Sequence, residues 1–343
     1  MKKDIVSLNW EQLQIEMEAL GEKKFRAKQI YEWLHVKGAE SFEQMTNIDK
    51  ATRKFLEENV LLRSSKVTEV LKDPDGTIKL QITLSDGLAI ETVLLTDKEG
   101  RKTACVSCQA GCAMGCAFCQ TGRLGLGRNL TAGEIVEEFF FMEKEAGTLD
   151  NIVFMGMGEP LQNLDAIRKV VAILTDKKGR CLSPRRITLS TCGLISGIYE
   201  LAEKGPFVRL AVSLTTADSA LREQLMPVSK GNPLPELKKA IKFYSEKTGK
   251  RITLEAALLS GQNTGPESAK RMIDFASGLD AYINLIPWNP VEGLQFKTPS
   301  RKECEEFVKI LEKANLKVNL RIRRGAKIGG ACGQLGRSSA SSI

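Results

Sequence analysis

The sequence lacks several features that mark common protein classes. It contains a single His, which disfavours His-based zinc sites and Ser–His–Asp chemistry. No apolar run approaches the ~18–20 residues that a membrane-spanning helix needs, and the first residues turn acidic at once, unlike a secretory signal. We therefore expect a cytoplasmic protein that makes no contact with membranes and whose thiols stay reduced.

Acidic residues are also missing from the end of the chain. The 343 residues carry a net charge of +8, and from residue 313 onward there is no acidic residue but seven basic ones: Lys313, Lys317, Arg321, Arg323, Arg324, Lys327 and Arg337. A second basic cluster comprises Lys177, Lys178, Arg180, Arg185 and Arg186. Either cluster alone is typical of solvated surface. Together they favour a phosphate-bearing partner such as RNA.

The periodicity of apolar residues divides the chain into parts. Residues 1–62 show helical spacing, with predicted helix ends at Gly21 and Gly38, and indicate a small helical domain. Residues 63–100 alternate polar and apolar side chains around turn sequences, which predicts a β-rich extension of two or three hairpin-linked strands. The Ser-rich residues 336–343 resemble a flexible tail.

Residues 101–335 alternate predicted strands with predicted helices. The strand candidates are NIVFMG, RITLST, RLAVSLT, RITLEAAL, AYINLIPW and KVNLRIR. This order is typical of an α/β fold in which helices cover a parallel sheet, either open or curled into a barrel. Functional residues of such sheets lie at the carboxyl ends of the strands.

Five of the nine cysteines fall within ACVSCQAGCAMGCAFCQTG. Zinc sites usually use two C-x2-C pairs that are ~12–20 residues apart, whereas the two pairs here are separated by seven. The spacing C-x3-C-x2-C of Cys112, Cys116 and Cys119 suits three thiolates on a [4Fe–4S] cluster. Such a cluster leaves one iron free for the amino and carboxylate groups of S-adenosylmethionine, and we favour this reading over zinc.

The segment NIVFMGMGEP predicts a strand that ends in a glycine-rich turn. We expect Gly156 and Gly158 to leave the strand edge bare for the methionine amino group, and Glu159 to accept a hydrogen bond from it. Alone, this motif is weak.

Several segments together resemble the RNA adenine-C2 methyltransferases of the RlmN/Cfr group. In chain order they are RKTACVSCQAGCAMGCAFCQTGRLGLGRNLTAGEI, VFMGMGEPLQN, RRITLSTCG, SLTTADSALREQLMPV, INLIPWNP and ACGQL, and LGEKKFRAKQIYEWLHVKG resembles the N-terminal accessory domain of that group. The resemblance covers nearly the whole chain. It implies a partial (β/α)6 radical SAM barrel behind an RNA-binding accessory domain.

The resemblance also implies a mechanism that uses two molecules of S-adenosylmethionine. The first methylates Cys332, and cleavage of the second at the cluster gives a 5′-deoxyadenosyl radical that removes hydrogen from the new S-methyl group. The methylene radical then adds to C2 of the base. Cys105 accepts a proton and forms a disulfide with Cys332, which releases the RNA, and Glu91 matches the acid–base carboxylate. Judged without the resemblance, Glu91 reads as a solvent-facing strand residue.

The S-adenosylmethionine contacts that the resemblance implies are Gly158, Glu159, Ser190, Ser213, Leu214, Thr215 and Asn289. The chain departs from the group at Cys108, where Ser is usual, and at Thr215, where His is usual. The approach to Cys332, KIGGACGQL, also lacks the group's acidic residue. We expect Cys181, Cys192 and Cys304 to be core or surface thiols, Trp288 to pack, and His35 to pack or face RNA.

The predicted substrates are the peptidyl-transferase adenosine of 23S rRNA and an anticodon-loop adenosine in some tRNAs. The expected electron donor is a flavodoxin or ferredoxin, and the expected state is a monomer. Two alternatives stay open at this point. One is methylation of C8 of the same rRNA base, and the other is a non-catalytic, zinc-dependent RNA-binding protein.

Overall fold

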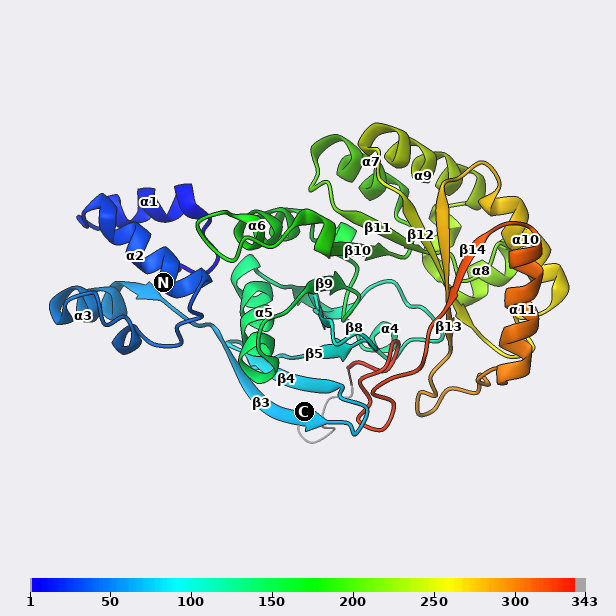
Figure 1. The fold of residues 1–343 in the computed structure, drawn as a ribbon, viewed down its shortest axis with the longest axis horizontal. Coiled ribbons are helices and arrows are strands. Elements are labelled where there is room, and N and C mark those ends of the chain that lie inside the picture. The colour runs from blue at the N-terminus through cyan, green and yellow to red at the C-terminus, as the bar shows by residue number, and fades with distance from the viewer. Residues whose placement is uncertain (1, 337–343) are drawn as a thin grey trace.

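The computed structural model describes residues 2–336. The chain begins with a small helical module, which lies at one end of the molecule in blue (Figure 1). Its elements are β1 (Lys3–Asp4), α1 (Trp10–Ala19), α2 (Lys24–His35), η1 (Phe42–Gln44), α3 (Lys50–Asn59) and β2 (Val60–Leu61). Strands β1 and β2 pair in parallel and tie the two ends of the module together. An Asn9–Gln12 capping box fixes the start of α1.

The β-rich extension forms the three predicted hairpin strands, β3 (Ser65–Lys72), β4 (Ile78–Leu84) and β5 (Ala89–Thr96). Strand β6 (Lys102–Cys105), which the sequence reading missed, pairs antiparallel with β5 and parallel with β9. It therefore joins the extension to the parallel sheet. Four residues are too few to show a period-two pattern.

The parallel strands after β6 are the six predicted ones: β9 (Asn151–Phe154), β10 (Ile187–Thr191), β11 (Arg209–Ser213), β12 (Ile252–Leu258), β13 (Ala281–Pro287) and β14 (Lys317–Leu320). In residues 2–336 they belong to one ten-stranded sheet in the order β3-β4-β5-β6-β9-β10-β11-β12-β13-β14. The end strands β3 and β14 do not pair, so the barrel is open. The predicted α/β class and partial barrel are confirmed.

Helices connect the parallel strands and cover the convex face of the sheet (Figure 1). They are α5 (Ala132–Ala146), α6 (Leu164–Thr175), α7 (Ile195–Lys204), α8 (Ser219–Leu225), α9 (Leu234–Thr248), α10 (Pro266–Ala276) and α11 (Arg301–Lys313), with 3₁₀ turns η2 (Pro160–Gln162), η3 (Pro184–Arg186) and η4 (Pro227–Gly231). None of the helices in residues 2–336 is long and apolar enough to cross a membrane.

Burial alternates along the parallel strands. On β12 and β13 the apolar residues Ile252, Leu254, Ile283 and Leu285 are buried in the main core, whereas Thr253 and Asn284 between them are only half-buried. Parallel strands that are covered on both faces read as continuous apolar runs. The polar alternation therefore leaves one face of this sheet, the concave one, available for ligands.

The helical module packs on the barrel through aromatic side chains. Tyr31 donates a hydrogen bond to Asp176 over 3.2 Å, and His35 stacks between Tyr31 and Phe140. His35 is fully buried and neither ring nitrogen has a hydrogen-bond partner. His35 therefore has a packing role. Burial lowers its pKa to about 3, and the positive charge of Arg63 contributes to the shift.

Replacement of His35 by Leu should reduce the sensitivity of the fold to acid. The unfolded chain takes up a proton near pH 6.5 and the folded chain only near pH 3, so stability is complete above pH 6.5 and falls on acidification. At pH 5 the cost is about 2 kcal/mol. Denaturant unfolding at pH 7.5 and pH 5 should show a smaller difference in H35L by that amount. The same pH dependence in both proteins would contradict this account.

Candidate active site

The cysteine loop connects two short antiparallel strands, β7 (Gln109–Cys112) and β8 (Gly125–Asn129). Cys112 ends β7, Cys116 lies in the following turn, and Cys119 caps α4 (Gln120–Arg123). Any side chain at Gly111 would put its Cβ 2.0 Å from the carbonyl oxygen of Gly125, so only Gly allows the two strands to pair here.

Neighbouring elements hold this loop. The amide of Ala117 donates to the carbonyl of Leu225 over 2.9 Å, and the indole of Trp288 donates to the carbonyl of Phe118 over 2.9 Å. Trp288 is otherwise buried, so it packs as expected and does not present a face to a base.

The three predicted cluster thiols interact electrostatically. Burial raises the pKa of Cys112 to about 11, and Cys119 adds to the shift. Burial also raises the pKa of Cys116, and the nearby thiols of Cys119 and Cys112 raise it further. In the described part of the chain no three Cys, His, Asp or Glu side chains are arranged to hold a metal ion as they stand.

A buried cation beside the loop fits an anionic cluster. Arg222 is fully buried. Its Nε donates to the backbone carbonyl of Leu214 over 3.1 Å, and its Nη2 donates to the backbone carbonyl of Cys192 over 2.8 Å. Its Nη1 has no partner in the protein. An unpaired donor on a buried charge is costly, and a thiolate-ligated iron–sulfur group would compensate it. The sequence reading missed Arg222, since an Arg in a short amphipathic helix reads as surface.

The glycines after β9 lie close to a neighbouring chain segment. A Cβ at Gly156 would lie 2.6 Å from the carbonyl oxygen of Val106, and one at Gly158 would lie 2.6 Å from Cβ of Gln109. Both glycines therefore also have a packing role, because the segment before the cysteine loop lies directly against them. Gly158 also has a φ of 105°, which favours Gly.

Glu159 lies next to this contact and is buried. Its Oε2 accepts the amide of Cys192 over 2.8 Å and its Oε1 accepts the amide of Leu161 over 3.1 Å. Burial raises its pKa, and these hydrogen bonds oppose the shift. The side chains of Cys192 and Thr191 also form hydrogen bonds with this carboxylate.

A line of polar side chains crosses the concave face of the sheet. Ser190 and Asn284 donate to the two carboxylate oxygens of Glu255, each over 3.4 Å, and Asn319 donates to Asn284 over 3.0 Å. The parallel register places Glu255 beside Asn284, and Asn284 beside Asn319. Burial raises the pKa of Glu255. The sequence reading found Ser190 but missed Glu255, whose alternation with the buried residues of β12 was the available signal.

The SLTT segment lies at the carboxyl end of β11. Ser213 is the last strand residue, Leu214 is buried and accepts from Arg222, and Thr215 is buried with a φ of 60°. A left-handed conformation is strained for Thr and is typical of functional sites. The Thr215 amide donates to the carbonyl of Glu255, which holds this turn beside the polar line.

Cys105 and Cys332 are 227 positions apart and are brought together here. Cys105 is the buried last residue of β6. Burial raises its pKa, and Cys332 is the next cause, which shows that the two thiols interact. Cys332 is exposed as a residue. Partial exclusion of water around its thiol is the main reason that the pKa is raised to about 12, and the nearby Glu255 and Cys119 contribute to the shift. The amide of Asn289 donates to the Cys332 carbonyl over 3.2 Å.

Glu91 is buried on β5 and is not the solvent-facing strand residue that the sequence alone suggests. Lys79, also buried, donates to its Oε1 over 2.8 Å. The amide of Gly336 donates to its Oε2 over 2.7 Å. Glu91 therefore fastens the chain just after Cys332, and Gly336, which was assigned to the flexible tail, is part of the fold. The rest of that predicted tail, 337–343, lies outside the described residues.

Of the three remaining cysteines, Cys192 alone lies near the cysteine loop, where its thiol forms a hydrogen bond with Glu159 and is close to Cys116 and Cys112. Cys181 is exposed, Cys304 is buried in the main core, and Cys192 is buried beside the cysteine loop. They are core and surface thiols, as expected.

Comparison with known proteins agrees with this geometry. Residues 3–62 match the ribosomal RNA large subunit methyltransferase N-terminal domain, and residues 106–276 match the radical SAM superfamily. A probable dual-specificity RNA methyltransferase RlmN of Treponema denticola is 60% identical over 93% of this chain and 92% of its own. The chain belongs to the RlmN family. A dual-specificity RNA methyltransferase RlmN of Nitratidesulfovibrio vulgaris is 42% identical over 97% of this chain and 94% of its own.

The fold agrees at the level of a whole solved structure. The crystal structure of a radical SAM methyltransferase from Sphaerobacter thermophilus has a TM-score of 0.94 and 40% identity, and the match covers 97% of this chain and 99% of the other. This RlmN-family chain is thus a radical SAM RNA methyltransferase whose cofactors are a [4Fe–4S] cluster and S-adenosylmethionine. The zinc-dependent, non-catalytic alternative is wrong.

Replacement of Lys79 by Met should destabilise the protein by about 3–5 kcal/mol, because Glu91 would keep a buried charge with no counter-ion. The matched control is Lys66→Met on the neighbouring strand β3, where the lysine is exposed and the change should stay within about 0.5 kcal/mol. Equilibrium denaturation measures both. Equal stabilities of the two variants would show that the ion pair does not hold this region.

Proposed function

We propose that this chain methylates C2 of an adenosine in RNA, with 23S rRNA and a tRNA as its two substrates. The observation that carries the proposal is the position of the Cys332 segment beside the cysteine loop, where the Gln120 amide donates to the Gly333 carbonyl over 2.8 Å, and near Cys105, whose pKa Cys332 helps to raise. The relatives' name, dual-specificity RNA methyltransferase, supports two RNA substrates.

The chemistry of the target atom explains why a thiol is needed. C2 of adenine is electron-poor, so it does not attack a sulfonium methyl group directly. The cluster and S-adenosylmethionine, when bound, supply the methyl group and the radical chemistry. We propose that Cys112, Cys116 and Cys119 hold the cluster. Cys332 carries the methyl group on its sulfur, and Cys105 breaks the link between Cys332 and the RNA by forming a disulfide.

Glu91 would receive the proton in this scheme. Lys79 and the Gly336 amide each donate a hydrogen bond to its carboxylate and hold it in place. Gly336, whose amide donates to Glu91, is four residues after Cys332 in the chain. Proton transfer and movement of the Cys332 loop would therefore be linked.

We also assign the S-adenosylmethionine contacts to the carboxyl edge of the sheet. The residues are Gly158, Glu159, Ser190, Ser213, Leu214, Thr215 and Asn289. The buried carboxylate of Glu159 suits an ammonium group, and the half-buried Ser190 and Ser213 offer hydroxyl groups. Asn289 would have to exchange its bond to the Cys332 carbonyl for a ligand.

The reaction consumes an electron, and we propose that a flavodoxin or ferredoxin supplies it. We further propose that the protein acts as a monomer in the cytoplasm. C8 methylation of the same rRNA base is the alternative reaction. Mass analysis of digested RNA, from a strain that lacks the gene and from one that carries it, distinguishes 2-methyladenosine from 8-methyladenosine.

The cluster assignment predicts different outcomes at two neighbouring cysteines. Cys116→Ser should lose the iron, because three thiolates are the minimum set, whereas Cys108→Ser should keep it. Cys108 is buried against Gly158 and its carbonyl accepts from Asn163 over 2.9 Å, which is a packing role. Anaerobic purification followed by iron analysis and visible absorption measures both. Equal iron loss in the two variants would overturn the assignment.

The roles of the two reactive thiols also differ. Cys332→Ala should form neither methylated RNA nor a covalent complex, because no sulfur is left to hold the methyl group. Cys105→Ala should accumulate a covalent protein–RNA complex, because the thiol that breaks the link is missing. Denaturing gels with labelled RNA show the complex. A crosslink in C332A, or none in a C105A protein that retains its cluster, would exclude these roles.

A further inference from the structure

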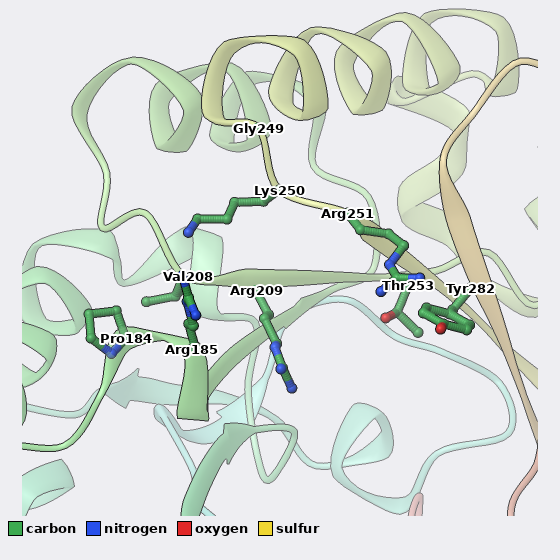
Figure 2. Close-up of a pocket in the computed structure, with 9 residues that line it drawn as sticks. All are labelled: Pro184, Arg185, Val208, Arg209, Gly249, Lys250, Arg251, Thr253 and Tyr282. Atoms are coloured by element: carbon green, nitrogen blue, oxygen red, sulfur yellow. The ribbon is translucent and has the colours of Figure 1, made fainter.

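A hollow of about 430 Å³ lies at the amino ends of β11, β12 and β13, at the opposite ends of the strands from the cysteine loop (Figure 2). Its lining includes Arg209 at the start of β11, Thr253 on β12 and Tyr282 on β13. Thr253 is two residues before Glu255, and Tyr282 is two before Asn284. Because side chains alternate along a strand, the hollow opens on the same concave face as the polar line.

The lining is strongly basic and holds no carboxylate. Four of its side chains are cationic: Arg185, Arg209, Lys250 and Arg251. Within residues 2–336 none of the four forms an ion pair, whereas other surface arginines, such as Arg101, Arg168 and Arg301, pair with carboxylates. Four like charges around one hollow repel one another. An anion that enters the hollow would relieve this repulsion.

The aromatic wall of the hollow is already organised for such a ligand. The guanidinium of Arg251 lies 3.8 Å from the centre of the Tyr282 ring, and Lys317 lies 5.7 Å from it. Stacking on a ring holds a guanidinium plane while its N–H edges stay free for paired hydrogen bonds to phosphate. Tyr282 is itself exposed, at 39% of its surface.

We propose that this hollow binds phosphodiester groups of the RNA substrate next to the nucleotide that reacts. Arg251 precedes Glu255 by four residues on the same strand face, which is a separation of about 13 Å at the usual strand rise. One RNA strand can therefore place a base at the carboxyl edge of the sheet and its neighbouring phosphates over the arginines. The proposal rests on RNA being the substrate. It gives the basic cluster that includes Arg185 a specific task.

The test compares two double variants that remove the same charge. Arg209→Gln with Lys250→Gln removes two cations of the hollow and leaves the Arg251–Tyr282 stack in place. Lys270→Gln with Lys309→Gln removes two exposed cations from α10 and α11, outside the hollow lining. Iron content and unfolding midpoint first show that both proteins are intact.

The probe is a labelled single-stranded RNA that contains the target adenosine and its natural flanking sequence, and fluorescence anisotropy is measured from 50 to 300 mM salt. The R209Q/K250Q protein should bind about tenfold more weakly at low salt, and its log–log salt slope should flatten by about 0.7 for each lost phosphate contact. The K270Q/K309Q protein should match the wild type. Equal affinities and slopes in the two double variants would overturn the proposal.

A competition arm identifies the source of the phosphate. Inorganic tripolyphosphate should displace the RNA from the wild type and have less effect on R209Q/K250Q. If tripolyphosphate discriminates between the proteins while the RNA does not, the hollow serves a small anion and the RNA assignment is wrong. If the wild type binds RNA through the hollow but transfers no methyl group to it, the proposed function fails and the binding site stands.

Discussion

The close approach of two chain segments, 105–109 and 156–159, positions the candidate site residues at the carboxyl edge of the sheet. Because Gly156 and Gly158 have no side chains, the segment after β6 lies directly against the turn after β9. Backbone hydrogen bonds join them, from Gly156 to Val106 over 3.0 Å and from Cys108 to Met157 over 2.8 Å. The hydroxyl of Ser107 accepts from the Met157 amide and donates to the carbonyl of Glu91. One contact therefore aligns Cys105, the start of the cysteine loop and the strand that carries Glu91.

The C-terminal segment completes the site from the other end of the chain. Thr121, just after the cysteine loop, donates to the carbonyl of Leu335 over 2.7 Å, and the Gln120 amide donates to the carbonyl of Gly333 over 2.8 Å. Asn289 holds the same segment at the Cys332 carbonyl, and Glu91 holds it at the Gly336 amide. These are single hydrogen bonds of ordinary strength, each worth about 1 kcal/mol. A segment held in this way can exchange its partners, which suits the role proposed for Cys332.

The concave face explains how a parallel sheet serves a large polar substrate. Helices bury one face, and the other presents a graded surface, with arginines at the amino ends and the Ser190–Glu255–Asn284 line nearer the carboxyl ends. The end strands β3 and β14 do not pair, and the segment after β14 runs between them to reach Asp75 and Glu91. Part of the net positive charge of the chain therefore lies at the hollow, where we propose that the RNA backbone binds.

The sequence by itself determined the parts that depend on local spacing. These were the alternation of strands and helices, the hairpin strands, the membership of the RlmN family, and the C-x3-C-x2-C spacing on which the proposed cluster site rests. The tertiary structure decided what depends on register and long-range contact. The interaction of Cys105 with Cys332, the burial of Glu91 against Lys79, and the placement of Glu255 and Arg222 each join residues that are distant in the chain. Periodicity specifies which face a side chain occupies, but only the packed sheet specifies which other side chains share that face.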